Sequence, residues 1–332
     1  MDSRGDDTLP RYSVQNMRIV IPGGSGQVGA ILGRAFAGEG HEVIVLSRHP
    51  RIGPWRTVKW DGGHLGEWAT EIDGADVVVN LAGRSVNCRY NAANRREIMD
   101  SRVQSTRAIG EAIAKAKHPP GLWLQASTAT IFSHRFDAPN DEATGIIGGS
   151  EPGVPDTWRF SIEVARAWEQ AAMDAATSST RKVLLRSAMT MSPDPDGIFD
   201  VLMGLVRRGL GGRAGDGKQF VSWIHETDFV NAVKWLVDRR DVDGPVNLCA
   251  PGALPNEQFM RELRQAAGVR IGLPASNWML ELGAIFMRTE TELILKSRRV
   301  WPGRLLDSGF TFAFPTWAEA ATNLVRRQRT MR

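Results

Sequence analysis

Apolar residues gather along this chain in short continuous runs that do not alternate with polar residues. Such runs of Val, Ile and Leu are typical of strands that are buried on both faces of a parallel sheet. A strand is therefore predicted for each of residues 17–22, 42–47, 76–80, 122–127, 182–186 and 245–249.

Between these runs, apolar residues recur with the spacing of one face of a helix. Helices are predicted over residues 27–37, 94–116, 161–175, 198–208 and 226–238. Alternation of strands and helices predicts an α/β fold with a doubly wound parallel sheet, the Rossmann arrangement. In such a fold the loops that follow the strands meet along one edge of the sheet, where ligands bind.

The sequence changes character after Ser192, where Pro193, Pro195 and a glycine-rich stretch over residues 209–217 interrupt the pattern. Further helices are expected within residues 256–296, in a smaller C-terminal lobe that would hold the substrate. The predicted organisation is a disordered N-terminal tail at 1–16, a nucleotide-binding domain at 17–191 with 219–250 returning to it, and a substrate lobe at 192–218 and 251–326.

Three glycines follow the first strand with the spacing Gly-x-x-Gly-x-x-Gly, at Gly23, Gly26 and Gly29. The first permits a tight turn, the second lets backbone N–H groups approach a pyrophosphate, and the third allows the helix to pack closely. The phosphates would then lie at the positive end of the helix dipole. Because a strand precedes these glycines and a helix follows them, the loop, including Gln27 and Val28, is predicted to bind a dinucleotide.

The end of the second strand indicates which dinucleotide is bound. Proteins that use NAD place Asp or Glu there to bind the ribose hydroxyls, whereas this chain has Ser47, Arg48 and His49. An acid would repel a 2′-phosphate, and a guanidinium pairs with it through charge-assisted hydrogen bonds. Ser47 and Arg48 therefore favour NADP(H), and a plain surface role for Arg48 is the alternative.

Several short motifs occur in order along the chain and together resemble one known family. They are Gly23-x-x-Gly26-x-x-Gly29, Asn80-Leu-Ala-Gly83, Asp100-Ser-Arg-Val103, Gly209-Leu-Gly-Gly212, Ser222-Trp-Ile-His225-x-x-Asp228, Gly244-Pro-Val-Asn247 and Leu305-Leu-x-x-Gly-Phe-x-Phe312. The chain resembles the epimerase-like (YfcH-like) branch of the extended, atypical short-chain dehydrogenase/reductases, whose members end in a small domain of unknown function. The resemblance covers residues 17–326 and implies an NADP(H)-binding protein with a small-molecule substrate.

The resemblance also implies cofactor contacts outside the glycine loop. They are Asp61 at the adenine, Leu81, Ala82 and Gly83 near the adenosine and its ribose, and Ala126, Ser127 and Thr128 at the nicotinamide. Two alternatives stay open, because Asp61 also suits a turn and Asn80 also suits a cap at the end of a strand.

The wider superfamily transfers the substrate proton with a Tyr-x-x-x-Lys pair, which this chain lacks. Its two tyrosines, Tyr12 and Tyr90, are each followed four residues later by an asparagine. The helix expected to carry the pair runs through residues 160–169 without a lysine. The resembling branch often has two tyrosines after its fifth strand, where this chain has Ile131 and Phe132.

Ser127, Thr128 and His225 are the remaining candidates for catalysis. Either hydroxyl could bind a substrate carbonyl, and a histidine titrates near neutral pH. Each has an alternative interpretation: the backbone could satisfy the hydroxyls at the end of a strand, and the histidine could hold the start of a helix. His134 and Arg213 are weaker candidates of the same kind, and no set of His, Cys and carboxylate residues has the spacing of a metal site.

Two classes of function therefore remain open. The first is an NADP(H)-dependent oxidoreductase or epimerase that acts on a small molecule with a non-standard proton donor. The second is a non-catalytic NADP(H)-binding protein that reports the redox state of the cofactor to an interaction partner. The intact phosphate loop and the full second lobe favour the enzyme, and the missing proton-transfer pair favours the sensor.

Charge and hydropathy argue against other classes of protein. A net charge of +4 over 332 residues is too small for a nucleic-acid-binding domain with a basic stripe. The arginines near the C-terminus, Arg326, Arg327, Arg329 and Arg332, are interpreted as a solvated, frayed tail. The best candidate for a membrane span, residues 278–287, is short and is interrupted by a glutamate, so no span is expected.

The two cysteines, Cys88 and Cys249, lie far apart in the sequence and suggest neither a disulfide framework nor a metal site. Reduced thiols fit a cytoplasmic protein. Extended reductases often dimerise through two helices, and the helices predicted at 94–116 and 161–175 could form such a homodimer.

Overall fold

The structure is a computed structural model, and it describes residues 16–50, 53–276 and 292–331. The predicted N-terminal tail lies outside these residues except for Asn16, and so does the apolar stretch at 278–287. Among the described residues, no helix is both long enough and apolar enough to span a membrane.

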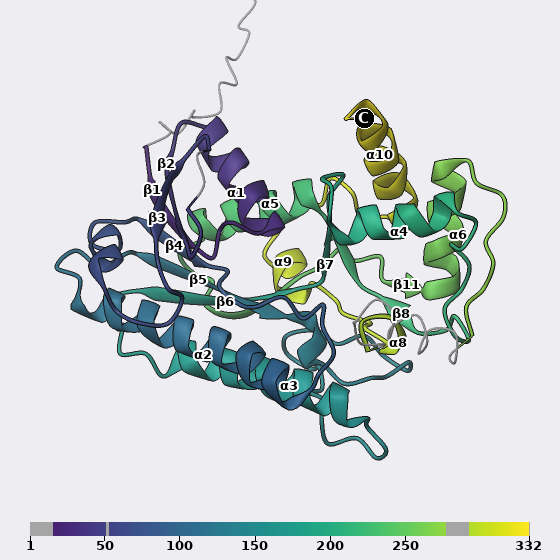
Figure 1. Ribbon diagram of the computed structural model, residues 1–332, viewed down its shortest axis with the longest axis horizontal. Coiled ribbons are helices and arrows are strands. Elements are labelled where there is room, and N and C mark those ends of the chain that lie inside the picture. The colour runs from purple at the N-terminus through teal and green to yellow at the C-terminus, as the bar shows by residue number, and fades with distance from the viewer. Residues whose placement is uncertain (1–15, 51–52, 277–291, 332) are drawn as a thin grey trace, which may run out of the picture.

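A seven-stranded parallel sheet forms the centre of the molecule (Figure 1). Its strands are β1 (Arg18–Pro22), β2 (Glu42–Ser47), β3 (Arg56–Lys59), β4 (Val77–Asn80), β5 (Leu122–Thr128), β6 (Arg181–Ser187) and β10 (Gly244–Leu248). They are arranged in the order β10-β6-β5-β4-β1-β2-β3, and each pair of neighbours is parallel. The predicted doubly wound α/β fold is confirmed.

Helices cover both faces of this sheet (Figure 1). One face carries α1 (Gln27–Gly38), α5 (Glu226–Asp238) and α9 (Gly303–Asp307), and the other carries α2 (Ala92–Lys115), α3 (Asp156–Met173) and the 3-10 helix η1 (Glu67–Glu71). Alternate strand residues enter the two layers: Ile19 and Ile21 pack in the first, and Val20 packs in the second. Because both faces are covered, successive strand positions are apolar, which explains the continuous runs.

The predicted helices are observed, with differences at their ends. The largest difference is at α3, which begins at Asp156 and not at 161. Its first turn, from Asp156 to Arg159, is exposed or half-buried. A turn without buried residues shows no apolar periodicity, so the pattern places the start of the helix too late.

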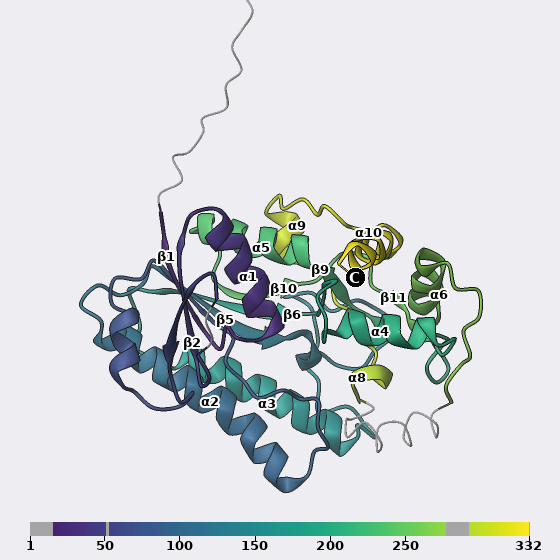
Figure 2. The same cartoon turned by 45° about the horizontal axis from the view of Figure 1, so that its top comes forward.

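A smaller unit continues beyond the carboxyl end of β6 (Figure 2). It contains β7 (Met189–Met191) paired with β9 (Trp223–His225), β8 (Phe220–Val221) paired with β11 (Leu254–Pro255), and the helices α4 (Ile198–Arg207), α6 (Asn256–Ala267), α8 (Glu292–Leu295) and α10 (Trp317–Thr330). Aromatic rings fill its core: Trp317 stacks on Phe259 with ring centroids 4.1 Å apart and packs against Trp223. This unit lies at the end of the sheet where the loops after the strands meet.

The predicted substrate lobe over 251–326 includes residues that pack with the large sheet. Leu305, Phe310 and Phe312 lie in the same apolar cluster as α1 and α5. The chain therefore returns to the large sheet after α8 before it ends in the small unit. A short aromatic segment gives no sequence sign of which core it enters, because either core would bury it.

The predicted frayed C-terminal tail is wrong, because α10 runs to Thr330, whereas the predicted solvent exposure is observed for Arg326 and Arg329. Gln328 is 3% exposed, and its side chain bonds to Arg207 (2.5 Å) and to Asp200 (2.9 Å). Arg327 pairs with Glu226 at the start of α5. These partners are distant in the sequence, so the arginine-rich end resembles a solvated run when only neighbouring residues are considered.

Candidate cofactor and substrate site

The glycine loop joins β1 to α1, and its glycines have different surroundings. Gly23 has a φ of 74°, and a Cβ there would lie 2.6 Å from the backbone of Ala82. A Cβ on Gly29 would lie 2.3 Å from the backbone of Gly24. Nothing lies within 4 Å of a Cβ built on Gly26. The first and third glycines of the motif therefore permit close packing, while Gly26 leaves open space in front of the loop.

The N-terminus of α1 opens onto this space. Gly26 is its N-cap, no side chain caps it, and its first turn has no acidic residue. Its first N–H groups are therefore suited to bind an anion, which the helix dipole also favours. The Nε2 atom of Gln27 is buried beside them and has no hydrogen-bond partner among the described residues. These features fit the pyrophosphate of a dinucleotide.

Arg48 follows β2 at the same edge of the sheet and lies beside Gly62. Its side chain is exposed, and no described residue holds its guanidinium in a hydrogen bond or ion pair. Ser47 is buried, and its hydroxyl accepts the N–H of His49 (3.2 Å), which fixes the turn that carries Arg48. The turn thus presents an unpaired guanidinium, a group well suited to bind a phosphate.

Asp61 lies after β3 and bonds to its own turn. Its carboxylate accepts the N–H groups of Gly63 (2.9 Å) and His64 (3.0 Å) and contacts the His64 ring (2.7 Å). These hydrogen bonds lower the pKa of Asp61 to about 2. The turn role that the sequence left open is therefore observed, and a contact with adenine stays a prediction.

Asn80 ends β4 and is fully buried. Its Oδ1 accepts the N–H of Ala82 (3.1 Å), and its Nδ2 donates to Gln125 on β5 (2.9 Å). The N–H of Leu81 donates to the carbonyl of Pro22 (2.8 Å). Asn80 is thus the cap at the end of a strand, and it holds the loop after β4 against the glycine loop.

Ser127 is committed to a buried ion pair. Its hydroxyl donates to Glu169 on α3 (2.6 Å), and Glu169 also accepts two hydrogen bonds from Arg186, each 2.8 Å long. All three residues are buried. The partner of this hydroxyl is a carboxylate, whereas the sequence suggested the backbone or a substrate.

His225 is fully buried and caps α5, with Nδ1 accepting the N–H of Thr227 (3.0 Å). Its ring stacks on Phe314 with centroids 4.0 Å apart, and Nε2 lies 3.3 Å from Oδ1 of Asn323. Burial, and then the nearby Arg327, lower the pKa of His225 to about 4. The ring is therefore neutral at physiological pH. Its role is to hold the start of a helix, which was one of the two interpretations of the sequence.

The weaker candidates are His134 and Arg213. His134 accepts the N–H of Ser297 at Nδ1 (2.8 Å), and burial lowers its pKa. Arg213 is exposed. Among the described residues, no group of three or more His, Cys, Asp or Glu could hold a metal ion.

A pocket of about 120 Å³ lies at the end of β5. It is lined by Val86, Tyr90, Ile98, Arg102, Thr128, Thr130, Phe160, Ser161, Val164, Trp168 and Glu292. Of the residues predicted to border the nicotinamide, Thr128 reaches this pocket. Its Oγ1 accepts the N–H of Thr130 (3.2 Å), which leaves its hydroxyl proton for a ligand.

Arg102 lines this pocket and was missed as a functional residue, although the motif at 100–103 contains it. Its Nη1 donates to the carbonyls of Arg84 (3.0 Å) and Ile98 (3.1 Å), and its guanidinium lies over the ring of Trp168. Burial lowers the pKa of Arg102 to about 10, so the side chain keeps its charge at neutral pH.

The segment that begins at α8 brings a charged cluster to the same pocket. Glu292 accepts the hydroxyl of Ser161 (2.5 Å), and its Oε1 lies 4.0 Å from both Lys296 and Arg298. Lys296 donates to the carbonyl of Thr130 (2.7 Å), and Arg298 donates to its hydroxyl (3.1 Å). Burial lowers the pKa of Lys296 to about 8. Sequence analysis missed this cluster because its partners lie far away along the chain.

Ile131 and Phe132, where the resembling branch often has tyrosines, lie in the apolar core. They are 1% and 2% exposed and pack with Ala165 and Val300. The guanidinium of Arg186 lies over the Phe132 ring. These two positions therefore offer no hydroxyl to a substrate.

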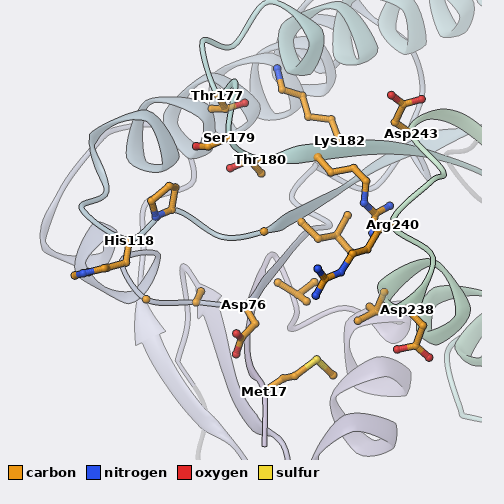
Figure 3. A pocket seen from close by; sticks show the side chains of 18 of the residues that line it. Met17, Asp76, His118, Thr177, Ser179, Thr180, Lys182, Asp238, Arg240 and Asp243 are labelled. Carbon is orange, nitrogen blue, oxygen red and sulfur yellow. The ribbon is translucent and has the colours of Figure 1, made fainter. Parts of the chain in front are cut away.

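A larger cavity, of about 1890 Å³, lies at the opposite edge of the sheet (Figure 3). It is lined by residues at the amino ends of the strands, among them Met17, Asp76 and Lys182. Ligands of doubly wound sheets bind outside the carboxyl ends of the strands. The glycine loop and Arg48 lie at that carboxyl edge, so the larger cavity is not the candidate site.

Known proteins resemble this chain over nearly its full length. Residues 19–249 match the NAD dependent epimerase/dehydratase family, and residues 275–324 match a domain of unknown function, DUF1731. Epimerase family protein SDR39U1 of Homo sapiens is 30% identical over 312 residues, which are 93% of this chain and 100% of that protein. Epimerase family protein YfhF of Bacillus subtilis is 26% identical over 95% of this chain and 100% of its own.

A solved structure shows the same likeness in three dimensions. The crystal structure of human SDR39U1 (isoform 2) with NADPH has a TM-score of 0.81 and 29% sequence identity to this chain. The match covers 93% of this chain and 99% of that one. The two units described above are therefore present together in both proteins.

Proposed function

This chain belongs to the NAD dependent epimerase/dehydratase family, and from that premise we propose that it is an NADP(H)-dependent oxidoreductase or epimerase acting on a small molecule. The observation that carries the proposal is the open glycine loop over the uncapped start of α1, with Arg48, unpaired among the described residues, just after the next strand. The structure of human SDR39U1 with NADPH supports the same cofactor.

Different residues of the carboxyl edge would bind different parts of the cofactor. The N–H groups at the start of α1, together with Gln27, bind the pyrophosphate, and Arg48 binds the 2′-phosphate. The loop that ends at Gly83 and the turn at Asp61 flank the adenosine. Ala126 borders the nicotinamide. When bound, the cofactor supplies or accepts the hydride of an alcohol–carbonyl interconversion.

The pocket at Thr128 is the proposed substrate site. Its volume of about 120 Å³ is smaller than the roughly 300–1,000 Å³ of pockets that take drug-sized ligands. Phe160 and Trp168 supply an apolar wall, and Thr128 and Arg102 supply polar groups. This combination supports a small carbonyl compound or alcohol as the reacting part of the substrate.

A non-catalytic NADP(H) sensor is the second candidate. It is supported by Ser127 and His225, which are committed to structural hydrogen bonds and not available to a substrate. A sensor must bind NADPH and NADP⁺ with different affinities, because a ligand shifts an equilibrium only by its differential affinity. Equal affinities for the two forms would therefore argue against it.

The homodimer through α2 and α3 and the cytoplasmic location stay predictions. The two helices pack side by side over one face of the sheet (Figure 1). Their outward residues are mostly charged, among them Arg96, Arg107 and Glu163. A dimer through these faces would therefore depend on ion pairs.

The test is a titration of the tryptophan fluorescence with NADPH and with NADH. We expect tight binding of NADPH and weak binding of NADH. Arg48→Glu removes a charge-assisted pair and adds a repulsion, so we expect it to weaken NADPH binding on the order of 100-fold. NADH binding is expected not to weaken, because an acid at this position can bind the ribose hydroxyls. Arg240→Glu, an equal charge change at the far edge of the sheet, is the matched control (Figure 3).

Two results would count against this account. If Arg48→Glu binds NADPH as tightly as the unmodified protein, Arg48 does not hold the 2′-phosphate. If the unmodified protein binds neither dinucleotide, the proposed function is wrong, and a role in partner binding without cofactor takes its place.

A further inference from the structure

Tyr90 lines the pocket at the end of β5, and we propose that its phenol exchanges the proton with the substrate oxygen. The inference rests on the proposed function, because it supplies the proton donor that an alcohol–carbonyl interconversion needs. Tyr90 is one of two tyrosines in the chain, and the other, Tyr12, lies outside the described residues.

The backbone and ring of Tyr90 are both held in place. Tyr90 directly precedes Asn91, the N-cap of α2, and its carbonyl accepts the Nε–H of Arg95 (2.9 Å). The residue is 8% exposed, and its ring packs edge-on against Phe160 with centroids 5.2 Å apart. An anchored side chain at the start of a helix meets the positional demand on a catalytic group.

Tyr90 stands in for a side chain that α3 does not provide. The wider superfamily places its tyrosine on this helix, but α3 offers Phe160 and Ser161 to the pocket. The ring of Tyr90 contacts Phe160 from the wall formed by the start of α2. Thr128 lines the same pocket and has a hydroxyl proton to donate to a ligand.

Arginines next to Tyr90 favour the ionised phenol. Arg102 on α2 and Arg298 after α8 each interact electrostatically with Tyr90. A nearby cation stabilises a phenolate, as the lysine of the usual Tyr-x-x-x-Lys pair does. Burial of the ring opposes ionisation, and so does Glu292, the one carboxylate among the described residues that line the pocket. Lys296 lies 4.0 Å from that carboxylate and offsets its charge.

Two further groups belong to residues close to Tyr90. Arg95 adds a cation, with its guanidinium 4.8 Å from the centroid of the Phe160 ring. Cys88 comes two positions before Tyr90, and its thiol interacts with Arg102. Among the described residues that line the pocket or interact with Tyr90, cations outnumber carboxylates, so we expect the electrostatic attraction to exceed the cost of burial.

In the reducing direction, the proposed step transfers one hydride and one proton to the substrate. The carbonyl carbon takes a hydride from the reduced nicotinamide, which is thereby oxidised, and the carbonyl oxygen takes the phenolic proton of Tyr90. The O–H bond of Tyr90 breaks, the O–H bond of the product alcohol forms, and the phenolate stays beside Arg102 and Arg298. Water then returns a proton to the phenolate. Oxidation of an alcohol is the reverse, with Tyr90 as the base.

The test follows the ionisation of Tyr90 and needs no substrate. In Tyr12→Phe protein Tyr90 is the single tyrosine, so the ultraviolet absorbance of tyrosinate against pH reports Tyr90 alone. We expect a midpoint below the value of about 10 for an unperturbed tyrosine. Adding Tyr90→Phe to this protein is expected to abolish the titration, which confirms the assignment.

Two comparisons link this midpoint to the proposed site. Arg298→Met removes a cation and is expected to raise the midpoint, whereas Arg298→Lys keeps the charge and is expected to raise it less. Saturating NADP⁺ is expected to lower the midpoint further, because its nicotinamide ring is cationic. Adenosine 2′,5′-bisphosphate, which lacks that ring, is expected to leave the midpoint unchanged. If circular dichroism shows that the Arg298 variants do not fold, the two nucleotide titrations carry the test.

Failure of this inference and failure of the proposed function give different results. A midpoint at or above about 10 overturns the role of Tyr90. So does a midpoint that NADP⁺ leaves unchanged although fluorescence shows NADP⁺ to be bound. Absence of any nucleotide binding overturns the proposed function, and the role of Tyr90 with it.

Discussion

The edge of the sheet that has the larger cavity is not the edge that has the candidate site. The amino edge has a cavity of about 1890 Å³, and the carboxyl edge has a pocket of about 120 Å³ (Figure 3). Yet the glycine loop, Arg48 and Tyr90 all lie at the carboxyl edge. Cavity volume therefore does not identify the functional edge of this protein, whereas the direction of strands and helices does.

The two edges differ physically because opposite ends of the helices face them. The C-terminal ends of α3 and α5 face the amino edge, where basic side chains satisfy their carbonyls. Lys182 donates to Ala172 (3.0 Å) and Ala175 (2.6 Å), and Arg181 donates to Leu236 (2.8 Å). At the carboxyl edge, no side chain caps the start of α1. Cations are thus used structurally at one edge, while N–H donors are kept for a ligand at the other.

The largest effect on stability is expected at the carboxyl edge, for Glu169→Gln. This change leaves the buried guanidinium of Arg186 without its counter-charge and weakens the bond from Ser127. We expect a loss of about 3 kcal/mol in the free energy of unfolding, measured with denaturant. Glu163→Gln, at an exposed site on the same helix, is the control, with an expected change within about 0.5 kcal/mol. Equal losses for the two variants would contradict a buried ion pair under this edge.

The next effect is a dependence of stability on pH that His225 creates. Its folded pKa of about 4 lies below the value of about 6.5 in an unfolded chain. The unfolded state therefore binds more protons between these values, so stability is full above pH 6.5 and falls as the pH drops towards 4. We expect a loss of roughly 2–3 kcal/mol over this range.

His225→Gln is expected to remove this pH dependence, because glutamine does not titrate. Denaturant unfolding at several pH values provides the measurement. The exposed His49, changed to glutamine, is the control and is expected to leave the slope in place. A slope that persists in His225→Gln would assign the titration to another group.

The smallest effect is expected at the amino edge, for Lys182→Met. The variant loses the hydrogen bonds to the end of α3, so we expect about 1 kcal/mol less stability. NADPH affinity is expected to stay the same, as measured by fluorescence titration. A clear loss of NADPH binding would place a ligand at the amino edge and reverse the comparison between the two edges.

Sequence reasoning succeeded where the structure depends on neighbouring residues. The glycine loop, the end of β2 with Arg48, and the continuous apolar runs are local patterns, and the fold that they predicted is observed. The turn at Asp61 and the cap at Asn80 were each foreseen as one of two alternatives, because a short polar side chain near a turn has few local partners to choose from.

The same reasoning failed where partners come together from distant parts of the chain. Ser127 was interpreted as contacting a substrate or the backbone, but it bonds to Glu169. His225 holds the start of a helix, as one interpretation had it, but its stacking on Phe314 was not foreseen. Tyr90 was set aside because no lysine follows it at the usual spacing. In the structure its cationic neighbours come from the middle of α2 and from the segment after α8, so spacing along the sequence could not reveal them.

By itself the sequence determined the class of fold and the edge of the sheet that carries the glycine loop, since each depends on residues within one turn or one strand, and it predicted a preference for a 2′-phosphate from Arg48. Only the tertiary structure decided which polar groups reach the pocket. Those contacts join residues 42, 131 and 166 positions apart, in the bonds Ser127–Glu169, Ser161–Glu292 and Thr130–Lys296. Local patterns carry no information about such pairs, because the packing of whole helices and segments brings them together.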